Sequence, residues 1–75
     1  NPITASDERQ LAALEAFNRA LELDPAAPNL AYNIGLIHRD RGEREQAMAA
    51  FRRALQTNPN DKDAKKLLEK LESKE

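Results

Sequence analysis

The 75-residue sequence has no cysteine, no tryptophan and a single histidine. Without cysteine the chain forms neither a disulfide nor a thiolate metal site, and one histidine cannot by itself complete a zinc site. No apolar run approaches the roughly 20 residues that span a bilayer, and no basic and then apolar leader opens the chain. We therefore expect a soluble protein held together by packing, and the missing cysteines leave its compartment undetermined.

The sequence has little excess charge of either sign. Twelve basic and 13 acidic residues give a net charge of −1, which argues against a dedicated binder of the phosphate backbone. Residues 1–25 hold two basic and five acidic residues, a net −3, whereas residues 26–58 hold five and three, a net +2. Nucleic acid is therefore not the expected partner.

An internal repeat organises what is present. The segment AALEAFNRALELDP (residues 12–25) aligns with QAMAAFRRALQTNP (residues 46–59), so that Pro25 and Pro59 lie 34 residues apart. The other matched pairs are Ala13/Ala47, Phe17/Phe51, Arg19/Arg53, Ala20/Ala54 and Leu21/Leu55. A repeat of this length is typical of stacked helical units.

Apolar residues recur at helical spacing in four segments. The pattern predicts helices at about residues 7–23, 28–41, 43–57 and 61–73, within a single domain over residues 1–75. Pro25 and Pro59 end the first and third helices, because the residue before a proline is pushed out of the helical region. Short links make neighbouring helices antiparallel. The expected fold class is all-α: an antiparallel helix-turn-helix repeat array of four helices.

Several single residues carry local predictions. Ser6 or Asp7 is expected to cap the first helix, with Ile3 folding back onto it, and Pro28 suits the first turn of the second helix. In mid-helix, Gly35 costs about 1 kcal/mol against alanine, so we expect a neighbouring helix to approach closely there. A second glycine, Gly42, is expected to end the second helix in the left-handed conformation.

The repeat resembles the tetratricopeptide repeat (TPR) family, whose 34-residue unit carries W-x2-L-G-x2-Y, then A-x3-F, then P. One complete copy at residues 28–61 supplies Ile34-Gly35, Ala47-x3-Phe51, Ala54 and Pro59. It departs from the family pattern with Ala31 in place of the usual tryptophan and His38 in place of the tyrosine. A half-repeat lies on each side. Because the chain starts without methionine, we expect either a processed protein or an excised fragment, and we favour the fragment; the sequence does not tell whether it comes from a longer repeat array.

The resemblance implies a protein-interaction module without catalysis, cofactor or metal. In this family the first helices of successive units line a concave groove that receives a peptide or a partner helix. Transferred to this sequence, the groove is lined by Asn29, Tyr32, Asn33, Leu36, Arg39, Asp40, Asp63, Lys66 and Lys70. Family members that bind chaperone tails hold a carboxylate with a clamp of Lys, Asn and Arg residues. Only Asn33 matches that clamp, so chaperone-tail binding is not expected.

Tyr32 and Leu36 form an apolar strip bordered by Arg39 and Lys66, which would suit an extended or helical peptide with acidic flanks. An aromatic residue at such a place is either an anchor for a partner or an edge residue of the core, and both readings stay open for Tyr32.

Three alternatives remain. His38 could be a general base or a pH switch, but it is read as a packing residue, and the nearby acids Asp40, Glu43 and Glu45 as residues that favour the start of a helix. An RNA-binding repeat would use the arginines, which are instead read as a solvated face: Arg39, Arg41, Arg44, Arg52 and Arg53. A self-associating scaffold would dimerise through an exposed strip of the first helix that includes Leu11 and Leu14.

Overall fold

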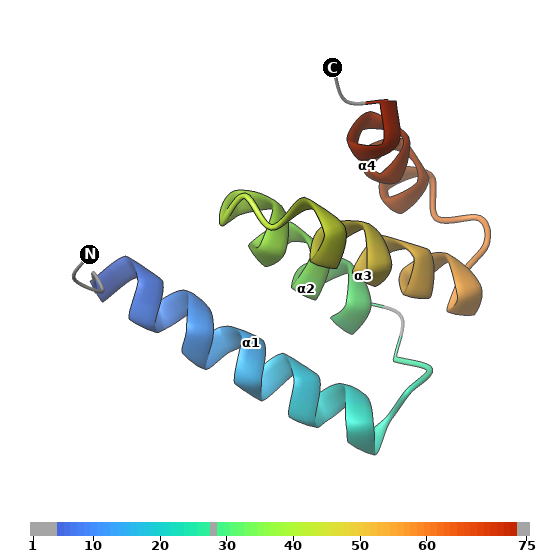
Figure 1. Cartoon of the computed structure of the whole chain (residues 1–75). Helices are drawn as coiled ribbons and strands as arrows, with labels where there is room; N and C mark the ends of the chain where they lie inside the picture. Colours follow the sequence, from blue (N-terminus) through green and yellow to red (C-terminus); the bar gives the residue numbers. More distant parts are fainter. Residues whose placement is uncertain (1–4, 28, 74–75) are drawn as a thin grey trace.

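The computed structural model of the chain describes residues 5–27 and 29–73. These residues form four helices and no strand: α1 (Ala5–Leu23), α2 (Leu30–Asp40), α3 (Arg44–Thr57) and α4 (Lys62–Ser73) (Figure 1). Helix α3 packs against both α2 and α4, and α1 packs against α2. The predicted all-α array of four helices is confirmed. No helix within the described residues is long and apolar enough to cross a membrane.

The helix ends partly follow the sequence signals. Helix α1 begins at Ala5, so Ser6 and Asp7 lie inside it and the predicted cap is wrong, although Asp7 still sits favourably in the positive first turn. At α4, the Asp61 carboxylate accepts a hydrogen bond from the Ala64 N–H at 3.1 Å, as an N-cap does. The expectations for Ile3 and Pro28 fall outside the described residues.

The turn between α2 and α3 is closed by Gly42, as expected. Its φ of 78° lies in the left-handed region that other residues rarely adopt. The N–H groups of Gly42 and Glu43 donate to the carbonyls of Arg39 and His38 at 3.0 and 2.8 Å. This double closure of the helix end resembles a Schellman motif and turns the chain sharply enough for α3 to run back along α2.

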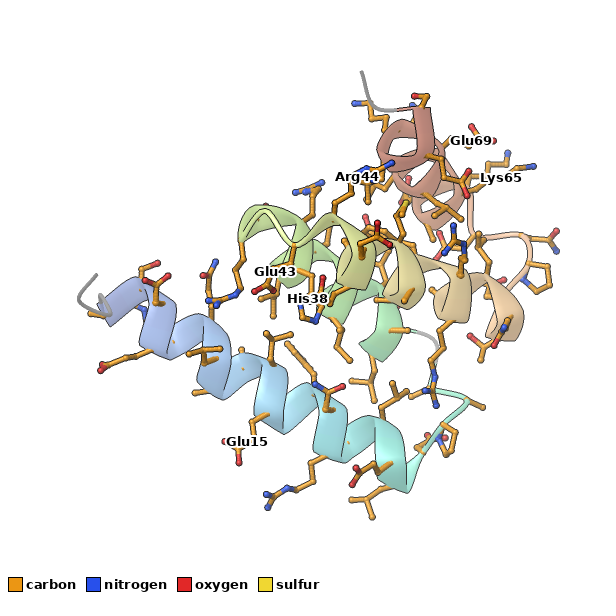
Figure 2. All side chains as sticks on the ribbon, in the orientation of Figure 1. Glu15, His38, Glu43, Arg44, Lys65 and Glu69 are labelled. Atoms are coloured by element: carbon orange, nitrogen blue, oxygen red, sulfur yellow. The ribbon has the colours of Figure 1, made fainter. Side chains whose placement is uncertain are left out.

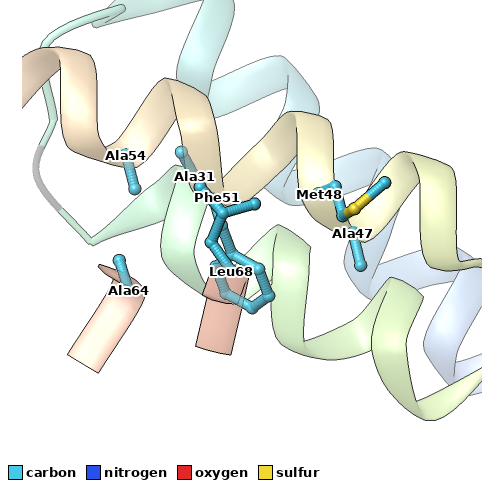
Figure 3. Close-up of a cluster of buried hydrophobic side chains, with 7 residues drawn as sticks. All are labelled: Ala31, Ala47, Met48, Phe51, Ala54, Ala64 and Leu68. Carbon is cyan, nitrogen blue, oxygen red and sulfur yellow. The ribbon is translucent and has the colours of Figure 1, made fainter. Parts of the chain in front are cut away.

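Two hydrophobic clusters form the core. The larger one joins α2, α3 and α4 and consists of Ala31, Ala47, Met48, Phe51, Ala54, Ala64 and Leu68 (Figure 3). The smaller one joins α1 to α2 and consists of Leu14, Leu21 and Ile34, with Phe17, Leu30, Ile37 and Ala50 packed against it. The Cα atoms extend over 39 × 36 × 15 Å, so the array is flat and its interior is thin.

Helices α2 and α3 approach closely at Gly35, where the Phe51 ring lies against the α2 backbone. A Cβ atom added to Gly35 would come within 2.6 Å of Phe51 Cε1 and 2.8 Å of Phe51 Cζ. The ring cannot move aside easily, because Phe51 is completely buried. The predicted crossing point is confirmed, and Gly35 is there because no larger side chain fits over the ring.

We predict that Gly35→Ala destabilises the fold. Overpacking a dense core costs about 1–3 kcal/mol, which exceeds the gain of about 1 kcal/mol from replacing glycine by alanine in a helix. Urea unfolding followed by circular dichroism measures the difference. The control is the same substitution in a Phe51→Leu background, where the shorter side chain leaves room and the added cost of alanine shrinks. A stabilised Gly35→Ala protein would contradict the close approach.

Candidate functional site

The predicted groove residues of α2 lie on one face of that helix. Each residue or adjacent pair follows the one before it after three or four positions, which places them along a single stripe. Asn29, which immediately precedes the helix, and Arg39 and Asp40 near its end are exposed, whereas Tyr32, Asn33 and Leu36 are half-buried. The opposite face of α2 carries the buried Ile34. This stripe is referred to below as the α2 stripe.

Helix α4 carries a matching stripe. Asp63, Lys66 and Lys70 are exposed and are spaced three and four residues apart. Each lies 34 residues after a residue of the α2 stripe, so the three correspond in the repeat to Asn29, Tyr32 and Leu36. Tyr32 and Leu36 from α2 and Leu67 from α4 all pack against the larger hydrophobic cluster. The shared cluster therefore underlies both the α2 stripe and the α4 stripe.

Tyr32 is held by an aromatic contact. Its ring centroid lies 5.8 Å from that of Phe51, with the two ring planes inclined at 57°, a tilted arrangement that aromatic pairs favour. Because Tyr32 is only half-buried, one part of the ring belongs to the edge of the core and another faces solvent. Tyr32 is thus a core-edge residue, and its role as an anchor for a partner remains a prediction.

The charges near the stripes are partly balanced. Arg39 Nη2 lies 3.2 Å from Asp40 Oδ1, and both side chains are exposed. This neighbouring carboxylate reduces the positive charge that Arg39 adds to the α2 stripe. On the α4 stripe, Lys66 and Lys70 are accompanied by the acidic Asp63. Exposed pairs of this kind contribute little to stability.

Two hollows lie away from these stripes. One, of about 490 Å³, runs along α1 and is lined by Ala12, Glu15, Ala16, Arg19, Ala20 and Leu23. The other, of about 290 Å³, lies at the start of α4 and is lined by Pro59, Asn60, Asp61, Lys62 and Lys65. Neither hollow includes a predicted groove residue.

The exposed part of α1 differs from the predicted one. Leu11 is 44% exposed, but Leu14 is only 8% exposed because it packs in the smaller cluster with Ile34. The prediction that Leu14 belongs to an exposed strip is therefore wrong. Leu23, at the end of α1, is 85% exposed instead.

A polar cluster at the α2–α3 turn was missed by the sequence interpretation. His38 Nδ1 lies 2.7 Å from Glu43 Oε1, and Arg41 Nε donates to Glu43 Oε2 at 3.3 Å (Figure 2). Arg41 Nη1 in turn donates to Gln10 Oε1 at 3.3 Å and lies 3.8 Å from Asp7 Oδ1, both on α1. The cluster therefore ties the turn to the first turns of α1. The only sign of this cluster in the sequence was that His38 and Glu43 are five residues apart with a glycine between them.

The hydrogen bond also fixes where the histidine proton lies. An ionised carboxylate only accepts hydrogen bonds, so His38 Nδ1 carries the proton and donates it to Glu43. This bond holds the pKa of Glu43 below its ordinary value of 4.5; desolvation of the carboxylate opposes the shift, and the hydrogen bond and positive charge of Arg41 add to it. Glu43 is thus a structural link, and its role is more than favouring the start of α3.

Most of the arginines read as a solvated face have partners within the protein. Arg44 Nε donates to the Leu71 carbonyl at 2.8 Å, and Arg52 lies 3.3 Å from Glu72. Arg39 and Arg41 are paired as well, with Asp40 and Glu43. Arg53 is exposed and takes part in none of these contacts. Arg44 is half-buried, so the sequence interpretation placed it too far into solvent.

Residues 5–27 and 29–73 contain no group of three or more histidine, cysteine, aspartate or glutamate residues that could hold a metal ion. A family model described as the tetratricopeptide repeat matches residues 28–61, which take in the whole of α2 and α3. Repeats of this family generally mediate protein–protein interaction and are not catalytic. No solved structure matches the chain.

We predict that the Glu43 link loses its stabilising effect in acid. Because the folded-state pKa of Glu43 lies below 4.5, the link contributes fully above that pH and is lost as the pH falls through the lower folded-state value. The difference in unfolding free energy between the original protein and Glu43→Gln should therefore shrink below pH 4.5. Urea unfolding over a pH series measures it. Glu69→Gln, at an exposed position on α4, is the control, and an equal pH trend in both variants would contradict the link.

Proposed function

The chain carries a tetratricopeptide repeat at residues 28–61, and on that premise we propose that it binds a protein partner across the α2 and α4 stripes. The partner segment is an extended or helical peptide with an apolar residue for the strip of Tyr32 and Leu36 and acidic residues for Lys66 and Lys70. The packing of Tyr32 against Phe51 is the single observation that supports this most directly.

The apolar part of the surface is suited to an anchor. Because the tilted contact with Phe51 already holds the Tyr32 ring, a partner that covers the ring loses little side-chain freedom on the protein side. Leu36 lies one turn further along α2 and is likewise held by the larger cluster. Half-buried aromatic residues of this kind often dominate binding energies at interfaces.

The charged part of the surface selects the flanks of the partner. Lys66 and Lys70 are one helical turn apart on α4 and both are exposed, so in the proposed mode of binding they present two positive charges to the flanks of the partner. Their attraction for acidic residues raises the association rate and weakens in salt, because exposed charges are screened over roughly 8–10 Å at physiological ionic strength.

A nucleic-acid partner fits the surface less well. Four arginines are engaged with Asp40, Glu43, Leu71 and Glu72 within the protein: Arg39, Arg41, Arg44 and Arg52. With one tyrosine and two phenylalanines in the sequence, and Phe51 fully buried, few aromatic rings are available for stacking on bases.

We predict that reversing the charge of the α4 stripe weakens binding of acidic peptides. A pool of fluorescent peptides with one leucine or phenylalanine between acidic residues is titrated against the full chain, and the tightest binder is retested. The Lys66→Glu/Lys70→Glu variant should bind it at least about tenfold more weakly, a change of about 1.4 kcal/mol, and with less dependence on salt. Lys65→Glu, on a different face of α4, is the matched control and should bind as the original chain does.

Tyr32 is tested separately because it also packs in the core. Tyr32→Phe keeps the contact with Phe51 and should retain binding, whereas Tyr32→Ala should lose it while circular dichroism confirms that the helices remain. Equal affinities of the Lys65→Glu and Lys66→Glu/Lys70→Glu variants, or no peptide binding at all, would contradict the proposal that the α2 and α4 stripes bind the partner.

A further inference from the structure

The first turns of α1 have little apolar support. Among the described residues, neither hydrophobic cluster takes a member from residues 5–12, and the first buried residue of α1 is Leu14. Within residues 5–12, Asp7 and Gln10 are half-buried and the others are exposed. These two residues are three positions apart, so they lie on one face of the helix. Residues 5–12 are called the first segment of α1 below.

One side chain from outside α1 contacts both half-buried residues of the first segment. Arg41, in the turn between α2 and α3, donates from Nη1 to Gln10 Oε1 at 3.3 Å, and the same nitrogen lies 3.8 Å from Asp7 Oδ1. The Arg41 side chain is only 18% exposed, so water and salt screen its contacts less than those of a fully exposed ion pair. Arg41 thus joins the first segment of α1 to the α2–α3 turn.

Arg41 is itself held in place from the side away from α1. Its Nε donates to Glu43 Oε2 at 3.3 Å, and the other oxygen of that carboxylate, Oε1, lies 2.7 Å from His38 Nδ1 (Figure 2). Glu43 therefore gives one oxygen to each of two donors. Because the guanidinium is already fixed at Nε, the Arg41 side chain loses less rotamer freedom when its Nη1 binds α1.

We propose that the first segment of α1 opens and closes as a unit separate from the rest of the fold, with Arg41 as its latch and Glu43 as the residue that positions the latch. Local opening costs less free energy than global unfolding where few buried apolar contacts are broken. When the first segment opens, the contacts of Arg41 break while Leu14 stays packed in the smaller cluster. The latch lies outside the α2 and α4 stripes, so the proposal does not depend on the function proposed above.

We predict that Arg41→Met speeds amide hydrogen exchange in the first segment of α1 alone. Methionine keeps a long unbranched side chain but donates no hydrogen bond. The N–H groups of residues 9–12 donate to carbonyls within the first segment. In NMR exchange measurements on the full chain they should exchange at least about fivefold faster, whereas those of residues 18–21 and 47–51 should change less than about twofold. Arg53→Met, at an exposed arginine of α3 that takes part in none of these contacts, is the matched control and should leave exchange unchanged.

The positioning role of Glu43 has a test of its own. Glu43→Gln offers one acceptor oxygen where two donors each need one, so exchange at residues 9–12 should also speed up, although residue 43 is not on α1. Added to Arg41→Met, the same change should cause no further increase there, because the latch is already absent. A full additive increase in the double variant would contradict the positioning role.

Trypsin gives a second measure of the same opening. Arg9 lies in the first segment, and Arg19 lies further along the same helix; both are exposed. Cleavage after Arg9 should quicken in Arg41→Met, whereas cleavage after Arg19 should not. If Arg41→Met unfolds the chain, Gln10→Ala, which removes one acceptor of the latch, decides by the same two measurements. The proposal is overturned if exchange rises equally in all four helices, if Arg41→Met and Arg53→Met give equal exchange at residues 9–12, or if cleavage after Arg9 is unchanged.

Discussion

The contact between the Phe51 ring and the α2 backbone at Gly35 is the constraint on which the other features depend. It brings α2 and α3 close enough for Phe51 to be completely buried. Tyr32 packs against the same ring, and the cluster around the ring includes Ala64 and Leu68 of α4. The position of the proposed binding surface on α2 and α4 therefore follows from one glycine and one phenylalanine.

The polar contacts complete the array at its edges, where a flat molecule has little core. The His38–Glu43–Arg41 cluster links the α2–α3 turn to α1. At the other end, Arg44 donates to the last turn of α4 through the Leu71 carbonyl. These side chains link neighbouring helices at the edges of the array. The contacts also engage the charged groups of Arg41 and Arg44, which are then less available to the phosphates of a nucleic acid.

The first and last described helices differ in the side chains that they leave exposed. Helix α4 turns charged side chains such as Lys65 and Glu69 outward. Helix α1 keeps the alanine and phenylalanine pattern of α3, although its Ala13, Phe17 and Ala20 are only half-buried.

The sequence by itself determined the fold class and the repeat, because the 34-residue spacing, the prolines and the helical periodicity are local signals. It also predicted the close approach at Gly35, because a glycine inside a helix destabilises that helix and is expected where a neighbouring helix leaves no room for a side chain. Only the tertiary structure decided that Leu14 is buried, that Ser6 and Asp7 do not cap α1, and that Glu43 binds His38 and Arg41. Those outcomes depend on which helix lies beside which, and pairings between side chains of different elements leave no periodic pattern in a single sequence.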